Sequence, residues 1–432
     1  MTFSTIRFMS YGWVNDFYVA PEFHFSYYGF DWLPYPSEMA IYAMFYGMLA
    51  CAILITLGLF YRFASIGFFI LFTYIELLDK TTYLNHYYFV SLVALLLIFL
   101  PANRYFSLDV RLGLVRESET VKAWHTGILK FQMAIVYIFA GIAKLESDWL
   151  FEAQPLKYWL HTAHHWPIVG DLFTQDWVAY LFSWAGCIYD LFIVFFLLNA
   201  KTRNFAYGFV ILFHFLTWML FPIGVFPWVM MVGTLIFLSD NLHKRALDVL
   251  RNILAFIPFP NFKSERKNIN PQSGFRIANV LLASYISFQI LFPFRYLLYP
   301  GDLFWTEEGF RFSWRVMLME KAGHGYFYLH DPETGIEWEV PTCNHLTYMQ
   351  EKQMRHQPDM ILQYASYLEE TYQDTTISTG HVDLKFKNPE IRAEVFVTLN
   401  GRPSQLFIDK KHNLAALENN LSHRYWLEPY NK

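Results

Sequence analysis

Long apolar segments separated by short polar connections make up the first 300 residues of the chain. Eight segments are long enough, or nearly long enough, to cross the hydrocarbon core of a bilayer, for which about 20 residues are needed. They are residues 37–59, 63–78, 83–100, 126–146, 176–199, 204–221, 224–239 and 275–292. Several are short or interrupted by polar residues, which favours tilted or broken helices around a cavity. The pattern predicts a polytopic α-helical membrane bundle of about eight helices over residues 1–299.

The pattern changes at about residue 300, where alternation with a period of two replaces the long apolar segments. The expected strands lie within residues 325–340, 382–386, 393–399 and 403–409. Turn residues 331–335 join two strands of a first hairpin, and Asn400-Gly401 is a strong turn signal for a second one. Residues 355–370 have helical periodicity. We therefore predict that residues 300–432 form an α+β, β-rich carboxy-terminal domain of ordinary size.

Positive charge gathers in one connection, residues 241–270, which contains few acidic residues. Its basic residues are Lys244, Arg245, Arg251, Lys263, Arg266 and Lys267. Short cytoplasmic loops carry an excess of Lys and Arg, so this connection is expected in the cytoplasm. The helix over residues 276–292 then carries the chain across the bilayer. The carboxy-terminal domain is accordingly predicted to be extracytoplasmic.

Composition agrees with a multi-pass integral membrane protein, since 55% of the residues are hydrophobic and only 16% are charged. The net charge of −4 gives no indication of a nucleic-acid partner. The cysteines Cys51, Cys187 and Cys343 have no metal-like spacing, and two of them lie in hydrophobic runs. We therefore expect the lipid bilayer to surround this part of the protein. We expect no disulfide and no metal held by cysteine.

Lys144 lies in an otherwise apolar run, residues 131–145 (FQMAIVYIFAGIAKL). An ionisable residue at membrane depth indicates a functional site by default. Alternatively, its side chain snorkels to the interface at a helix end, as Glu146, Asp148 and Trp149 allow. In the functional interpretation, burial disfavours the ammonium form, and a neutral amine acts as a general base toward a phenol or hydroquinone.

A second polar cluster includes Glu76, Lys80, Asn85 and His86. Glu76 and Lys80 are four residues apart, so we predict a structural ion pair along one helix face. Asn85 and His86 begin a new apolar run and are poorly explained as surface groups. An amide and an imidazole there are suited to bind a ligand oxygen or a developing oxyanion.

The other histidines offer weaker signals. His161, His164 and His165 resemble a metal cluster, but no second ligand group completes it, and we expect interfacial residues and no metal site. His214 is a lone histidine on an apolar helix, a pattern typical of a satisfied core residue. Motifs for nucleophile-elbow hydrolysis, nucleoside triphosphate use and dinucleotide binding are absent from the sequence.

Five sequence blocks, taken together and in order, resemble the vitamin K-dependent γ-glutamyl carboxylases, specifically their bacterial relatives in the horizontally transferred transmembrane (HTTM) group. The blocks are ELLDKTTYLNHYYF (76–89), FLPANRYFSLD (99–109), IVYIFAGIAKLESDWL (135–150), FPIGVFPWVM (221–230) and FSWRVMLMEKAG (312–323). The resemblance covers nearly the whole chain. It implies an enzyme that uses reduced vitamin K or a related quinol, O2 and CO2. Such an enzyme forms the quinone epoxide and converts glutamate in a peptide or protein substrate to γ-carboxyglutamate.

The resemblance also implies roles for particular residues. Lys144 stands where the family has the base that deprotonates the hydroquinone, and Asn85 and His86 stand at the pair that stabilises the quinone oxygen anion. Such chemistry must be kept dry, which accounts for its place inside a bundle. As further candidates for cofactor binding we take His214, Trp305 and Trp314; with Ser313, these two tryptophans are expected near the junction of bundle and tail.

Two departures from the family pattern concern the junction of bundle and tail. Glu320 stands where animal members have a histidine, and Phe310 where they have a tyrosine. The resemblance therefore implies quinol oxidation more directly than peptide carboxylation, and it also allows a quinol epoxidase without carboxylation. The buried polar residues by themselves fit two more hypotheses: a proton-coupled membrane transporter, with Lys144 and Glu76 as a relay, and a redox-inactive scaffold.

Overall fold

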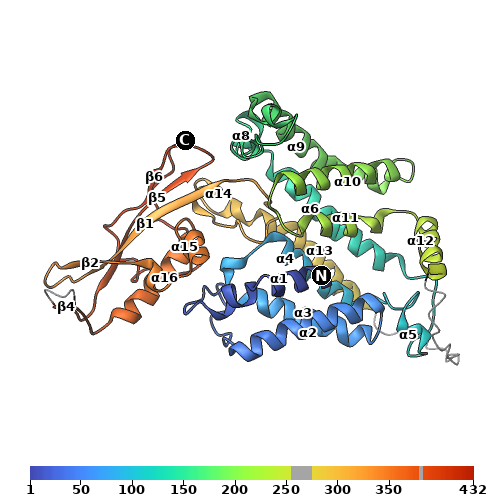
Figure 1. Cartoon of the computed structure of the whole chain (residues 1–432), viewed down its shortest axis with the longest axis horizontal. Coiled ribbons are helices and arrows are strands. Elements are labelled where there is room, and N and C mark those ends of the chain that lie inside the picture. Colours follow the sequence, from blue (N-terminus) through green and yellow to red (C-terminus); the bar gives the residue numbers. More distant parts are fainter. Residues whose placement is uncertain (254–274, 379–382) are drawn as a thin grey trace.

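Two bodies make up the molecule, a helical bundle and a strand-rich domain beside one end of it (Figure 1). The computed structural model describes residues 1–253, 275–378 and 383–432. The bundle contains α1 Thr2–Ser10, α2 Glu38–Leu57, α3 Tyr61–Leu78, α4 Asn85–Phe99, α5 Leu108–Arg111, α6 Ala123–Ala143, α7 Ser147–Phe151, α8 Leu156–His161, α9 Asp176–Leu198, α10 Arg203–Leu220, α11 Phe226–Thr234, α12 Asp240–Ile253 and α13 Phe275–Leu291.

Each of the eight apolar segments coincides with a helix: α2, α3, α4, α6, α9, α10, α11 and α13. Within the described ranges, five stretches are long and apolar enough to cross a membrane: α2, α3, α6, α9 and residues 277–298, which combine most of α13 with the turn after it. The helices α4, α10 and α11 fall outside this criterion. The mostly helical first part is therefore confirmed, with five candidate spans.

The carboxy-terminal domain combines a sheet with helices on one side. Its elements are α14 Leu303–Thr306, β1 Lys321–His330, β2 Glu337–Val340, α15 Tyr348–Met354, α16 Pro358–Tyr372, β3 Thr375–Ser378, β4 Asp383–Phe386, β5 Glu390–Leu399 and β6 Gln405–Ile408. The four-stranded antiparallel sheet has the order β2-β1-β5-β6. Both predicted hairpins and the β-rich class are confirmed.

Two details of this domain differ from the expectation. The strand predicted within residues 382–386 is β4, and it pairs with β3, a strand that was not predicted, and not with β5. The predicted helix begins at Pro358, three residues later than expected, because a shorter helix, α15, precedes it. Pro at a first helical turn is favourable, since its fixed φ suits the helix and no amide hydrogen is lost there.

The hydrophobic core is continuous across the junction of the two bodies. Alternate residues of β5, such as Val395 and Val397, are fully buried on the face that α16 covers. The same apolar cluster includes Ala143 and Trp149 from the bundle. Apolar burial is worth about 25 cal/mol per Å², so a shared core fixes the domain against the bundle.

The predicted basic connection lies partly on α12, a helix whose described residues are all at least partly exposed and include Lys244, Arg245 and Arg251. Lys263, Arg266 and Lys267 lie outside the described residues. In Figure 1, α12 lies on the far side of the bundle from the sheet, the arrangement that the positive-inside prediction requires.

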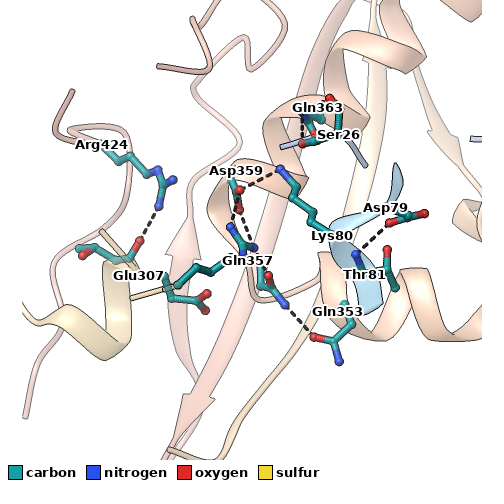
Figure 2. A network of polar contacts seen from close by, with 12 residues as sticks. Ser26, Asp79, Lys80, Thr81, Glu307, Gln353, Gln357, Asp359, Gln363 and Arg424 are labelled. Atoms are coloured by element: carbon teal, nitrogen blue, oxygen red, sulfur yellow. Dashed lines mark hydrogen bonds and ion pairs between the residues drawn. The ribbon is translucent and has the colours of Figure 1, made fainter. Parts of the chain in front are cut away.

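The predicted ion pair between Glu76 and Lys80 is wrong. Helix α3 ends at Leu78, and the extended backbone of Asp79 (φ −149°) breaks the helical spacing before Lys80. Instead, Lys80 Nζ lies 2.8 Å from Asp359 Oδ2 on α16, and Figure 2 shows the two side chains pointing toward one another. Lys80 thus joins the bundle to the carboxy-terminal domain.

A second cation shares Asp359. Arg311 Nη1 lies 2.7 Å from Asp359 Oδ2, and Arg311 Nη2 donates a hydrogen bond to Gln357 Oε1. Burial alone would raise the pKa of Asp359, but Arg311 and Lys80 hold it well below its usual range. The carboxylate is therefore charged at neutral pH and ties both cations to α16.

Candidate functional site: a buried ion pair at an apolar cavity

Lys144 directly follows α6, and its side chain turns into the protein. The residue is 6% exposed. Its Nζ lies 2.8 Å from Asp190 Oδ2 on α9 and also donates to the carbonyl oxygen of Ala140 at 3.3 Å. The ring of Trp149 lies 5.3 Å from the same nitrogen. Lys144 is thus half of a buried ion pair, with an aromatic wall beside it.

The close approach of α6 to α9 sets this geometry. A Cβ on Gly141 would lie 2.7 Å from the backbone nitrogen of Leu191, closer than atoms of real side chains come. Glycine at this position allows the two backbones to pack with almost no gap. Trp149 is fixed to α9 because its Nε1 donates a hydrogen bond to the carbonyl oxygen of Ser183 on that helix at 2.8 Å.

Beside the ion pair lies a cavity of about 90 Å³. Its polar lining residues are Tyr137, Lys144, Asp190, His214 and Thr217. Most of the wall is apolar, including Val136, Ala140, Trp149, Leu156, Trp159, Phe213, Phe221, Phe226, Met230 and Met317. Polar groups are therefore few and convergent in an otherwise apolar space, which is the usual character of a small-molecule site.

His214 is the second polar group of interest in this cavity. Its Nε2 lies 3.0 Å from the hydroxyl of Tyr137, which also contacts Thr234 Oγ1 at 3.1 Å. The Nδ1 atom is buried and has no hydrogen-bond partner among the residues that the structure describes. Buried polar atoms are nearly always paired, so this nitrogen is available to a ligand hydroxyl.

Asn85 and His86 lie behind the cavity wall and do not line the cavity. The amide of Asn85 donates to the carbonyl oxygen of Arg315 at 2.8 Å, and the next residues along the chain, 316 and 317, belong to the lining. The ring of His86 lies 5.8 Å from that of Phe226, which separates it from His214. Lys144 and His214 share the cavity, whereas Asn85 and His86 support its wall.

Trp305 and Trp314 are not among the cavity residues either. Trp305 packs against Phe407 and Tyr430 inside the carboxy-terminal domain, and its Nε1 donates to the carbonyl oxygen of Glu428 at 2.7 Å. Trp305, which we expected to bind the cofactor, thus lies in the core of the carboxy-terminal domain and outside this cavity. Trp314 stacks on Tyr88 and is 1% exposed, so it fills the bundle core next to the site.

Sequence reasoning missed Asp190, the partner of Lys144. The signal was present, because Asp190 is a single acidic residue inside the apolar part of a 23-residue helix. An acid in such a place normally has a buried cationic partner. Pairing requires knowledge of which helices are neighbours, and that is a property of the fold.

A titratable carboxyl lies close to the Lys144 end of the site. Glu146 caps the short helix α7, accepting from the backbone nitrogens of Trp149 at 2.8 Å and Asp148 at 3.2 Å. Burial, with a smaller contribution from the neighbouring Asp148, raises the pKa of Glu146 to about 7. The cap therefore changes charge near neutral pH.

Comparison with known families covers both bodies of the molecule. Residues 1–241 match the family model of the HTTM domain. Residues 275–432 match the family model of the lumenal domain of vitamin K-dependent gamma-carboxylase. No solved structure matches the chain. The two family matches follow one another along the chain, in the same order as the bundle and the sheet.

Proposed function

Since the chain belongs to the vitamin K-dependent γ-glutamyl carboxylase family, we propose that it oxidises a vitamin K hydroquinone and carboxylates peptide glutamate. In the overall reaction, hydroquinone, O2, CO2 and a glutamate residue give the quinone epoxide, a γ-carboxyglutamate residue and water. The observation that carries this proposal is the ion pair of Lys144 and Asp190, which is buried beside an apolar cavity.

The chemistry of the cavity lining suits a flat hydroquinone. Its ring system needs an apolar wall, and its hydroxyl groups need polar partners, which Lys144 and the Nδ1 atom of His214 offer. The cavity of about 90 Å³ is smaller than an engineered cavity of about 150 Å³ that holds benzene. Entry therefore requires movement of the wall, for which the flexible side chains of Met230 and Met317 are suited.

When bound, the hydroquinone supplies, with O2, a base strong enough to remove a γ-proton from glutamate. Lys144 prepares this step by taking a hydroxyl proton at Nζ. It must first lose its own proton, and Asp190 can accept that proton along the 2.8 Å hydrogen bond.

His214 orients the second hydroxyl through Nδ1, while Tyr137 and Thr234 hold its ring in place. Asn85 positions residues 315–317 through the carbonyl oxygen of Arg315. The apolar wall excludes water, so that a strong base formed in the cavity meets the substrate and not solvent.

A second candidate function is quinol epoxidation without peptide carboxylation. Its support is the position of the two departures from the family pattern. Glu320 accepts a hydrogen bond from Trp159, and Phe310 packs against Phe304 at the edge of the carboxy-terminal domain. Glu320 thereby contacts a residue of the cavity wall, while Phe310 lies in the domain that is expected to present the peptide.

The test uses the purified full-length protein in lipid nanodiscs with reduced vitamin K, O2, labelled bicarbonate and a glutamate-containing peptide. The parent is compared with Lys144→Met and with the matched control Lys244→Met. Lys244 also pairs with an acid, Glu119, at 3.3 Å, but both side chains are exposed and neither lines the cavity. We expect epoxide and labelled peptide from the parent and the control, and neither from Lys144→Met.

Epoxide without label in the peptide would favour the epoxidase. Absence of both products from the parent with several glutamate peptides would refute the enzymatic proposal. Unchanged products from Lys144→Met would refute the assigned role of Lys144 alone.

A further inference from the structure

The turn between β5 and β6 of the carboxy-terminal domain reaches into the bundle. This turn, residues 400–402, includes Asn400 and Gly401 with positive φ angles of 52° and 74°. Arg402 donates two hydrogen bonds to the carboxylate of Asp148, both at 2.7 Å, and Asn400 Nδ2 donates a third at 2.8 Å. The side chain of Asp148 is 4% exposed. A paired arginine fork of this kind is among the stronger and more directional contacts in proteins.

Asp148 transmits this contact to the cavity. It belongs to α7, and the next residue, Trp149, forms the cavity wall 5.3 Å from Lys144 Nζ. The backbone carbonyl of Asp148 also accepts from Gln154 at 2.8 Å, which fixes the end of the short helix. A five-residue helix has little stability of its own, so its position depends on such contacts.

The same turn reaches a second wall of the cavity through Glu320. The backbone nitrogen of Asn400 donates to the carbonyl oxygen of Glu320 at 2.8 Å, and Asn400 Oδ1 accepts from the backbone nitrogen of Glu320 at 3.0 Å. Glu320 Oε2 then accepts from Trp159 Nε1 at 2.6 Å. Trp159 lines the cavity. The positions of Trp149 and Trp159, which both line the cavity, therefore depend on the same turn of the carboxy-terminal domain.

We propose that Arg402 is a positioning residue for the quinol site and that, through Asp148, it holds the Trp149 wall against Lys144. The inference rests on the proposed function, which it deepens by making the quinol site complete only when the carboxy-terminal domain is docked. The bundle then binds and oxidises quinol productively only with the peptide-presenting domain in place. This order limits the formation of a strong base where no glutamate can be reached.

The electrostatics of Asp148 agree with this role. Burial alone would raise the pKa of Asp148, but the hydrogen bonds from Arg402 and Asn400 outweigh it and lower the pKa. Without Arg402, the buried carboxylate loses its counter-ion and takes up a proton more readily. Loss of Arg402 is thus expected to weaken the site more at mildly acidic pH than at neutral pH.

The test compares the parent with Arg402→Gln, Arg402→Lys, Asp148→Asn and the double variant Arg402→Gln/Asp148→Asn. The matched control is Arg392→Gln, which removes an arginine on the neighbouring strand β5 whose partner, Glu390, lies in the same domain at 2.7 Å. Two quantities are measured in nanodiscs. They are the dissociation constant of 2-methyl-1,4-naphthoquinone by equilibrium dialysis, and kcat and KM for epoxide formation.

We expect Arg402→Gln to weaken quinone binding and to lower kcat/KM by about 100-fold, the loss typical of a displacement of about 1 Å at a site. Arg402→Lys should recover part of this loss, because the charge remains but the paired geometry does not. Because both residues act through one contact, the double variant should be no worse than Arg402→Gln. Arg392→Gln should match the parent.

Parent-like quinone binding and parent-like kcat/KM in Arg402→Gln would overturn the inference. Additive losses in the double variant would overturn it as well, because Arg402 would then act independently of Asp148. If the parent binds quinone but forms no epoxide, the proposed function fails, while the binding series still decides the role of Arg402. If Arg402→Gln does not fold, Arg402→Lys and Asp148→Asn decide it through the same measurements.

Discussion

The ion pair of Lys144 and Asp190 can be broken in a way that separates its structural part from its chemical part. Its two atoms are 2.8 Å apart, and each side chain is 8% exposed. At an effective dielectric constant of about 20, their attraction is about 6 kcal/mol. Removal of one partner leaves the other charge buried, which typically costs about 3–5 kcal/mol of stability. We expect Asp190→Asn to lose stability on this scale.

Activity should fall for a separate reason. Asp190→Asn removes the group that is proposed to accept the proton of Lys144, and the loss of a general acid or base typically lowers rates about 10²- to 10⁴-fold. The double variant Lys144→Met/Asp190→Leu removes both charges and refills the space with apolar atoms. Replacement of a buried pair in this way is often neutral or stabilising. The double variant should therefore fold as well as the parent and remain inactive.

Thermal unfolding in detergent micelles and chromatographic detection of epoxide measure the two effects. Lys244→Met/Glu119→Leu is the matched control, because this pair is exposed and should change neither quantity. Epoxide formation by Lys144→Met/Asp190→Leu at the parental rate would refute Lys144 as the base. A parental unfolding temperature in Asp190→Asn would show that the pair is not held in a dry environment.

Three further predictions concern packing and pH. Gly141→Ala should lower the stability by about 1–3 kcal/mol, because the added Cβ pushes α6 away from α9. A Cβ at Gly208 meets nothing within 4 Å, so the control Gly208→Ala should be neutral or stabilising in thermal unfolding. Equal losses of stability in the two variants would contradict this prediction. The pKa of Glu146 rises to about 7, so protonation stabilises the folded protein, and stability should fall as pH rises from about 4.5 to 7. Because Glu146 is partly exposed, the expected loss of stability over this pH range is about 1–2 kcal/mol. Glu146→Gln should remove this dependence of stability on pH. An unchanged pH dependence in Glu146→Gln would contradict the prediction. The pKa of Asp359 is held low, so the stability that its ion pairs contribute should be lost as pH falls below about 3.9. At neutral pH, Asp359→Asn should make the carboxy-terminal domain more sensitive to limited proteolysis. Resistance equal to that of the parent would contradict this prediction.

The apolar pattern was sufficient to predict the helices and the division into a helical and a β-rich part. Burial of a helix or a half-buried strand leaves a local period in the sequence, and that period does not depend on partners. Strand β3, residues 375–378, leaves a weaker trace, because two of its four residues are exposed and it pairs only with β4. The strand was therefore missed, although the strong Asn400-Gly401 turn was recognised.

The sequence predicted those site residues that are unusual by themselves, but not the partners with which they pair. Lys144 stands out because an ammonium group in an apolar run is costly. Its partner Asp190 lies 46 positions away, and Lys80 pairs with a residue 279 positions away. Such partners follow from tertiary packing, which a sequence without its fold does not specify. The error for Glu76 and Lys80 arose from the assumption that α3 continues for two further residues.

The residues of the proposed site and the two departures from the family pattern lie in different parts of the molecule. Lys144, Asp190 and His214 lie within the bundle, and neither departure touches them. Glu320 instead contacts Asn400 and Trp159, at the boundary between the cavity and the carboxy-terminal domain. An altered side chain there changes how the domain meets the cavity and leaves Lys144, the proposed proton acceptor, in place. Because Glu320 also holds Trp159 in the cavity wall, we expect a change at this position to alter both the acceptance of the peptide and the closure of the proposed quinol site.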